Sequence, residues 1–164
     1  MPHVPRPGRV AQIYREQLSN PRRERQFMAS VGFFAAFAIV RIVTHAIRAG
    51  VGPFHNLSVG GRHLHHLVFG IVGLLGTGYL WLVQLGTGMP GCSRAASRAT
   101  SVAYGASSAI TLDEFALWLN LEDVYWARQG RESVDAVVLF GAVLSIGLWG
   151  RPFFRELLRE VRRV

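Results

Sequence analysis

The chain has 164 residues, half of them hydrophobic and only 17% charged, a balance that is too apolar for an ordinary soluble fold and fits a single membrane domain. The formal net charge is +8, and every basic residue is arginine rather than lysine. Six arginines precede residue 27 and five follow residue 150, so the middle of the chain lacks the mixed basic and aromatic surface of a nucleic-acid binder. We therefore expect no nucleic-acid partner. The single cysteine, Cys92, excludes an internal disulfide and a cysteine-based metal framework.

Residues 1–26 form a basic segment that ends with a signal for the start of a helix. Asn20 is a suitable N-terminal cap, and Pro21 is suited to the first turn, where a backbone N–H is not needed. The apolar block 27–47 follows directly. At a rise of about 1.5 Å per residue, about 20 residues cover a hydrocarbon core of about 30 Å, so we expect this block to cross a membrane.

Three further apolar blocks follow, and each predicts another spanning helix. They cover residues 64–85, 99–121 and 134–149. All three are rich in glycine, alanine and serine, and small side chains let membrane helices pack closely. The predicted fold is therefore all-α, an integral membrane bundle of about four transmembrane helices within residues 27–149.

The C-terminal segment 150–164 has the pattern of an amphipathic helix. Apolar residues at helical spacing oppose a row of arginines; they are Phe153, Phe154, Leu157, Leu158 and Val161, opposite Arg155, Arg159, Arg162 and Arg163. We expect this segment to lie on anionic lipids at the cytoplasmic face, and a solvated basic tail is the alternative.

The distribution of arginines also predicts the orientation in the lipid bilayer. Thirteen arginines fall on the two tails and the middle connection, against four on the first and third connections. Because basic residues are enriched in cytoplasmic loops, we expect a multi-pass protein of a bacterial plasma membrane with both termini in the cytoplasm.

Polar residues inside predicted membrane helices are costly, and this topology brings nearly all of them to the outer half of the bundle. They lie near the end of the first helix, at the start of the second, and about 12 Å before the end of the third. These residues are Arg41, His45, His63, His65, His66, Asp113 and Glu114. The sequence therefore predicts one polar site built from three helices.

The chemistry of that site has two interpretations. His45, His63, His65, His66 and Glu114 offer nitrogen and oxygen ligands suited to zinc, iron or manganese. Adjacent positions on a helix diverge by about 100°, so residues 65 and 66 can face one ion only if the helix begins irregularly. The alternative is a hydrogen-bonded cluster of histidines and carboxylates.

The charged residues predict a buried pair between Arg41 and Asp113 or Glu114, because an unpaired charge at that depth is strongly unfavourable. One arginine balances one carboxylate, so the second carboxylate must be protonated, paired with a histidine or bound to a cation. Asp113 and Glu114 are therefore the candidate catalytic residues, since such a carboxylate can act as a general acid or base.

Three functions fit these residues. The first is a metal-assisted hydrolase or oxidoreductase that acts on a lipid or periplasmic substrate, with a metal-bound water as nucleophile. The second is a proton or small-ion transport component, which needs a homo-oligomer because four helices make a narrow unit. The third is a non-catalytic membrane partner whose buried charges specify assembly.

Four segments carry a resemblance to a known group of proteins. They are Gly-Gly-Arg-His-Leu-His-His-Leu-Val-Phe-Gly at 60–70, Asp-Glu-Phe-Ala-Leu-Trp-Leu at 113–119, Asp-Val-Tyr-Trp at 123–126 and Gly-Arg-Glu-Ser-Val-Asp at 130–135. Over roughly residues 30–140 the chain resembles a group of small, uncharacterised bacterial integral membrane proteins. The resemblance implies a membrane protein and brings no assigned activity.

Overall fold

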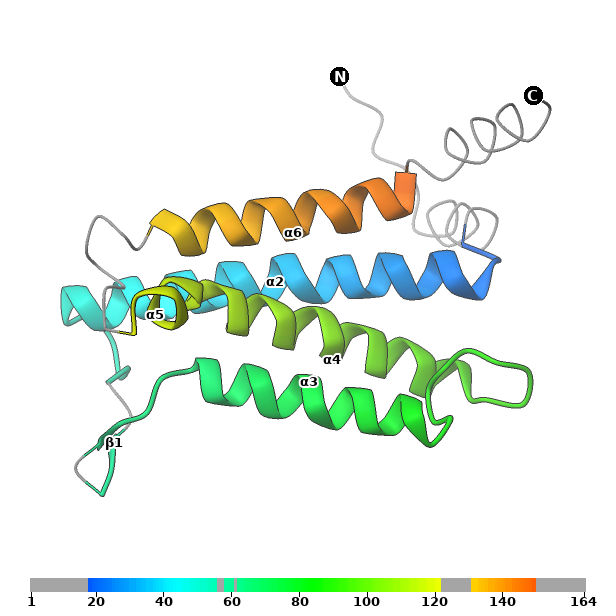
Figure 1. Cartoon of the computed structure of the whole chain (residues 1–164), viewed down its shortest axis with the longest axis horizontal. Helices are drawn as coiled ribbons and strands as arrows, with labels where there is room; N and C mark the ends of the chain where they lie inside the picture. Colours follow the sequence, from blue (N-terminus) through cyan, green and yellow to red (C-terminus); the bar gives the residue numbers. More distant parts are fainter. Residues whose placement is uncertain (1–17, 56–57, 61, 122–130, 150–164) are drawn as a thin grey trace.

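The computed structural model describes residues 18–55, 58–60, 62–121 and 131–149, which form a set of long helices (Figure 1). In chain order the elements are α2 (Pro21–Ala49), β1 (Ser58–Val59), β2 (Arg62–His63), α3 (Leu67–Leu82), α4 (Arg94–Asp113), α5 (Phe115–Asn120) and α6 (Arg131–Trp149). The long helices α2, α3, α4 and α6 run alternately in opposite directions, so α2 begins and α6 ends at the same end (Figure 1). The predicted helical class is confirmed for this part of the chain, and the first connection adds an antiparallel ribbon of two strands, each two residues long.

The start of α2 agrees with the sequence prediction. The side chain of Asn20 accepts hydrogen bonds from the backbone N–H groups of Arg22 and Arg23, and Pro21 occupies the first helical position. The helix ends at Gly50, whose positive φ of 65° favours glycine. With 29 residues, α2 extends beyond the predicted block 27–47 at both ends.

The other helix boundaries differ more from the predicted blocks. α3 is shorter than the predicted 64–85, and α6 begins three residues before the predicted 134. The block 99–121 is not one helix. α4 begins earlier, at a cap in which Ser93 accepts from the N–H of Ala96, and it ends at Asp113, because the backbone of Glu114 leaves helical geometry. The sequence hides this break because apolar and small residues continue on both sides of it.

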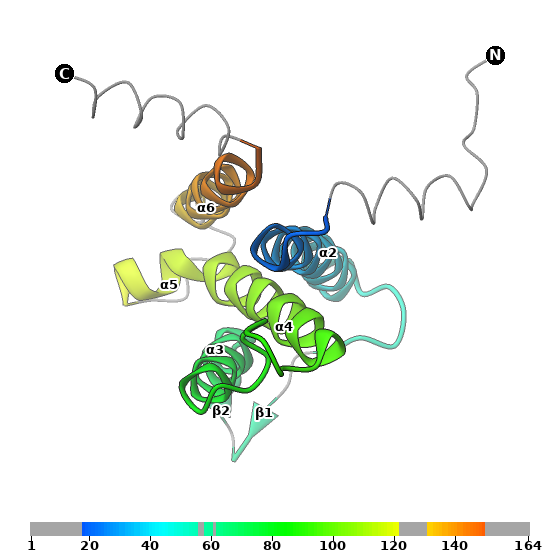
Figure 2. The ribbon, with the colours of Figure 1, turned by 90° about the vertical axis from the view of Figure 1, so that its right-hand side faces the viewer.

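The helix α4 lies between the other long helices and contacts α2, α3 and α6 (Figure 2). Small residues make these contacts close. A Cβ atom added to Gly105 would overlap the backbone carbonyl of Ala29 in α2, and one added to Gly70 in α3 would overlap Thr111. The predicted role of glycine in close helix packing is therefore confirmed on both sides of α4.

The distribution of side chains is unusual for a helical protein. Ile42, Leu75 and Leu139 are examples of many exposed large apolar residues on α2, α3 and α6. The buried apolar cluster is small and centres on Phe33 and Val137. The buried side of α4 carries mostly polar residues instead.

Two buried or partly buried serine hydroxyls in α4 form hydrogen bonds inside the helix itself. Ser101 donates to the carbonyl of Ser97, and Ser108 donates to the carbonyl of Tyr104. These polar side chains therefore need no water between the helices.

Among the described residues, one helix, α2, is long and apolar enough to cross a membrane, and only 17% of its apolar window is buried within the protein. α3 is apolar but has 16 residues, shorter than a typical span. The four predicted spans are thus reduced to one candidate by length and composition. The predicted interfacial helix at 150–164 and most of the basic segment 1–26 lie outside the described residues.

Candidate functional site

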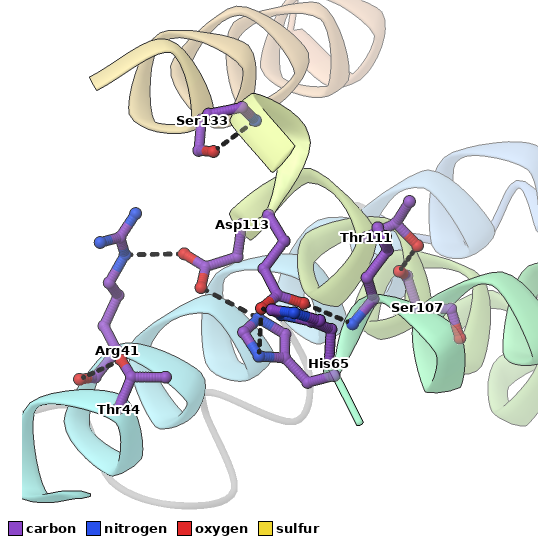
Figure 3. A network of polar contacts seen from close by, with 11 residues as sticks. Arg41, Thr44, His65, Ser107, Thr111, Asp113 and Ser133 are labelled. Atoms are coloured by element: carbon purple, nitrogen blue, oxygen red, sulfur yellow. Dashed lines mark hydrogen bonds and ion pairs between the residues drawn. The ribbon is translucent and has the colours of Figure 1, made fainter. Parts of the chain in front are cut away.

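Five of the seven predicted polar residues meet at one end of the bundle, where α2 and α4 end and α3 begins (Figure 3). The network joins Arg41 from α2, two histidines that precede or cap α3, and two carboxylates at the end of α4. Its members are Arg41, His65, His66, Asp113 and Glu114. This convergence follows from the alternating helix directions, as the sequence predicts.

Asp113 is the last residue of α4 and its side chain is fully buried. The Nε atom of Arg41 lies 2.7 Å from Asp113 Oδ1, and Nε2 of His66 lies 3.2 Å from Oδ2. The predicted pair between Arg41 and a carboxylate is present, and it joins the end of α2 to the end of α4. A fixed guanidinium beside this carboxylate compensates its charge where little water reaches it.

Glu114 lies at the start of α3 in space, although it follows α4 in the chain. The backbone N–H of Leu67, the first residue of α3, donates to Glu114 Oε2 at 2.8 Å. His65 Nδ1 lies 2.9 Å from Oε1 of the same carboxylate. Glu114 therefore caps α3 from another helix, where the helix dipole favours a negative charge.

Backbone positions outside the regular helices make this cluster possible. Side chains of consecutive residues in a regular helix diverge by about 100°. Glu114 departs from helical geometry, with φ of −110° and ψ of 26°, so Asp113 and Glu114 both reach the imidazole of His66, and Glu114 reaches that of His65 as well. His65 lies before α3, and His66 is the N-terminal cap with φ of −66° and ψ of −19°, so the helix itself begins only after both histidines.

The electrostatic layout places histidines outside and carboxylates inside. The side chains of His65 and His66 are 22% and 24% exposed, whereas those of Asp113 and Glu114 are 0% and 5% exposed. Arg41 provides one full positive charge against two carboxylates, so the histidines and the start of α3 must provide the remaining compensation. A change in histidine charge would be felt directly by both buried carboxylates.

Two predicted metal ligands occupy other positions. His45 lies on α2 one turn beyond Arg41, with an exposed side chain. His63 belongs to β2, where its backbone pairs with Ser58, and its side chain lies outside the described residues.

The predicted zinc, iron or manganese site gains no support from the described geometry. In the part of the chain that the structure describes, no group of three or more His, Cys, Asp and Glu side chains is arranged to hold a metal ion. The histidine nitrogens approach carboxylate oxygens directly. The metal site stays a prediction.

Sequence reasoning missed one residue that supports the site. Ser133, in the first turn of α6, is buried, and its Oγ accepts a hydrogen bond from the backbone N–H of Ala116 at 2.9 Å. Asn120 at the end of α5 also donates to Glu132 at 3.0 Å. α6 thus holds α5 in place directly after the break at Glu114, through a cap between helices that no local sequence pattern reveals.

Comparisons of the chain with protein-family models, curated proteins and solved structures find no match. The resemblance to small bacterial integral membrane proteins therefore stays a prediction.

Proposed function

We propose that the chain is a multi-pass membrane protein whose cluster of histidines and carboxylates accepts and passes protons, as a component of proton or small-ion transport. The observation that carries this proposal is the position of His66. One of its ring nitrogens lies 3.2 Å from Asp113 Oδ2 and the other lies 3.5 Å from Glu114 Oε1. An imidazole between two carboxylates can take a proton on one nitrogen and release it from the other.

The membrane part of the proposal rests on the distribution of polar and apolar side chains. A soluble bundle buries its large apolar residues, whereas here serine, threonine and charged side chains occupy much of the interior and large apolar side chains cover the outside. In lipid, small and hydroxyl-bearing residues between helices are favourable. We propose that α2, α3, α6 and the pair α4 and α5 cross the bilayer, with the start of α2 at the cytoplasmic face.

The proton route follows the contacts inward from the partly exposed histidines. A proton taken up by His65 allows the proton on its Nδ1 to pass to Glu114 Oε1, 2.9 Å away. Glu114 passes it to Nδ1 of His66, and His66 releases the proton on its Nε2 to Asp113. Each transfer returns the donor to its starting charge, so the net result is one proton moved from the exposed edge to the buried carboxylate.

Arg41 has a supporting part in this scheme. A guanidinium stays charged throughout the range of pH in which imidazole titrates. Its contact with Asp113 therefore keeps one fixed positive charge beside the carboxylate that receives the proton. Because four helices form a narrow unit, we propose that a homo-oligomer completes the route across the membrane.

The test is proton flux into proteoliposomes that contain the purified protein and a pH-sensitive dye. We expect Glu114→Gln to lower the flux by about 100-fold, since the amide cannot relay a proton and general acid–base groups contribute at least that factor. The wild-type flux should change between about pH 5 and pH 8, where imidazole ordinarily changes charge.

The chain offers a matched control at the same end of the bundle. Asp135 lies on α6 with an exposed side chain, and Asp135→Asn makes the same change in charge outside the cluster. Equal flux in the wild type and Glu114→Gln, or an equal loss in Asp135→Asn, would contradict the proposal.

A further inference from the structure

The opposite end of the bundle carries a second charged cluster that the proton route does not use. Glu24 in the first turn of α2 is buried, and two arginines from the first turns of α4 bind it. Arg94 makes a two-point contact, with Nε 2.9 Å from Oε2 and Nη2 3.0 Å from Oε1. Arg98 contacts Oε1 through Nε at 2.8 Å and Nη2 at 2.7 Å.

This arrangement holds two guanidinium groups in fixed positions at the surface. The side chain of Glu24 is 5% exposed, whereas those of Arg94 and Arg98 are 57% and 41% exposed. The glutamate therefore orients the arginines from below, and their outer faces meet the surroundings. Guanidinium groups fixed in this way lose little entropy when they bind an anion.

The charge of this end is strongly one-sided. In the described residues 18–25 and 83–98 there are five arginines, Arg22, Arg23, Arg25, Arg94 and Arg98, against one acidic residue, Glu24, so the net charge is +4. Such an end attracts anions, and guanidinium binds phosphate, as it binds carboxylate, by paired hydrogen bonds.

The depth of the cluster favours a lipid headgroup over a dissolved anion. Trp81 in α3 and Tyr104 in α4 stack with ring centroids 5.3 Å apart, and Trp81 also lies under the guanidinium of Arg25 at 4.7 Å. Tryptophan and tyrosine are enriched where acyl chains meet headgroups. Arg98 is six residues before Tyr104, which is about 9 Å closer to the start of α4. If the two rings lie where acyl chains meet headgroups, Arg98 lies in the headgroup layer.

We propose that this end of the bundle, at Arg22, Arg23, Arg94 and Arg98, binds the phosphate of an anionic phospholipid headgroup, with Glu24 as the residue that positions Arg94 and Arg98. The lipid source rests on the membrane location proposed above. The exposed apolar side chains of α3, such as Tyr79 and Leu82, would pack against the acyl chains of the same lipid.

The test uses the full-length protein in detergent micelles and follows the unfolding midpoint while phosphatidylglycerol or phosphatidylcholine is added. We expect phosphatidylglycerol to raise the midpoint more than phosphatidylcholine of the same chain length. Arg94→Gln leaves Arg98 to pair with Glu24, and it should weaken the apparent affinity for phosphatidylglycerol about fivefold, the effect of one basic residue at an anionic surface.

Two further variants keep the result interpretable. Arg48→Gln removes an exposed arginine in the last turn of α2, at the other end, and should leave the phosphatidylglycerol response at the wild-type level. The double variant Arg22→Gln with Arg23→Gln keeps the pairs of Glu24 with Arg94 and Arg98, and should weaken the affinity by about 25-fold.

Three results would overturn the lipid site. They are equal responses to the two lipids, equal effects of Arg94→Gln and Arg48→Gln, and a rise in the midpoint that inorganic phosphate alone reproduces. Loss of the lipid response with proton flux intact removes only the lipid site. Absence of flux in a protein that still responds to phosphatidylglycerol removes only the proton route.

Discussion

The two ends of the bundle both bury carboxylates, but they compensate the negative charge in different ways. At the end where α4 stops, the partners of Asp113 and Glu114 are Arg41 and two histidines. Imidazole is a group that ordinarily changes charge near neutral pH. At the end where α4 starts, Glu24 is bound by two arginines, whose charge does not change there. Proton exchange is proposed for the first end, and the second provides a positive surface.

The balance of charge along the bundle repeats this difference. At the histidine end the described residues contain four arginines, Arg41, Arg48, Arg62 and Arg131, and four acidic residues, Asp113, Glu114, Glu132 and Asp135, so the formal charge is zero with neutral histidines. The arginine end carries +4. This asymmetry is what the positive-inside rule expects of a protein whose arginine end faces the cytoplasm.

The largest expected contrast comes from neutralising a carboxylate at each end. Asp113→Asn removes the buried carboxylate charge beside Arg41, and we expect a loss of about 3 kcal/mol in the free energy of unfolding. Glu24→Gln should cost about 1 kcal/mol or less, because Arg94 and Arg98 are half-exposed and can turn toward water or lipid headgroups. Denaturant unfolding in detergent measures both, and equal losses would mean that the two ends are not different in kind.

A change that disturbs helix packing in the middle of the bundle should affect both ends. Gly105→Ala places a methyl group against the backbone of Ala29, where α2 and α4 cross, and should cost about 1 to 3 kcal/mol by overpacking. We expect it to lower both the proton flux and the lipid response. Gly76→Ala on α3 is the matched control, since nothing lies within 4 Å of the added methyl group, and a loss of stability there would argue against the packing described.

A smaller loss of stability is expected from a change at Ser133. This residue supports the backbone next to the histidine end but is not a member of the network of histidines and carboxylates. Ser133→Ala removes the cap on the N–H of Ala116 and should cost about 1 kcal/mol, as the loss of a helix cap usually does. Thermal unfolding in the same detergent measures this cost. Ser133→Thr keeps the hydroxyl and should retain most of the stability.

The smallest expected effect concerns metal. If the histidine end exchanges protons, elemental analysis of the purified protein should find no stoichiometric zinc, iron or manganese, and added zinc should leave the unfolding midpoint unchanged. A full equivalent of metal that is lost in His65→Ala would instead support the predicted metal site, with His63 and His45 as the ligands to examine next.

The sequence predicts the histidine end well because its residues are fixed by helix direction and helix rise. Alternation of four apolar blocks is enough to place Arg41, His65 and Asp113 at one level. The sequence does not reveal the break at Glu114, because Phe115 and Ala116 continue the apolar pattern. That break decides that both carboxylates reach the histidines.

The arginine end is harder to read from the sequence. Glu24 stands among arginines of its own segment, and local spacing favours pairs with those neighbours. Its partners are 70 and 74 residues away, on α4. Ser133 is missed for the same reason, since its contact with Ala116 exists only after α5 and α6 have packed.

Infrared difference spectroscopy between about pH 8 and pH 5, the range in which imidazole ordinarily titrates, tests the proposed proton exchange in the cluster most directly. We expect the wild-type protein to show carboxyl and imidazole bands that are altered together by Glu114→Gln and by His66→Gln, because these groups share their protons. His45→Gln, an exposed histidine at the same end, should leave the carboxyl bands in place. Carboxyl bands that do not respond to His66→Gln would contradict a shared proton and leave the cluster as a structural contact.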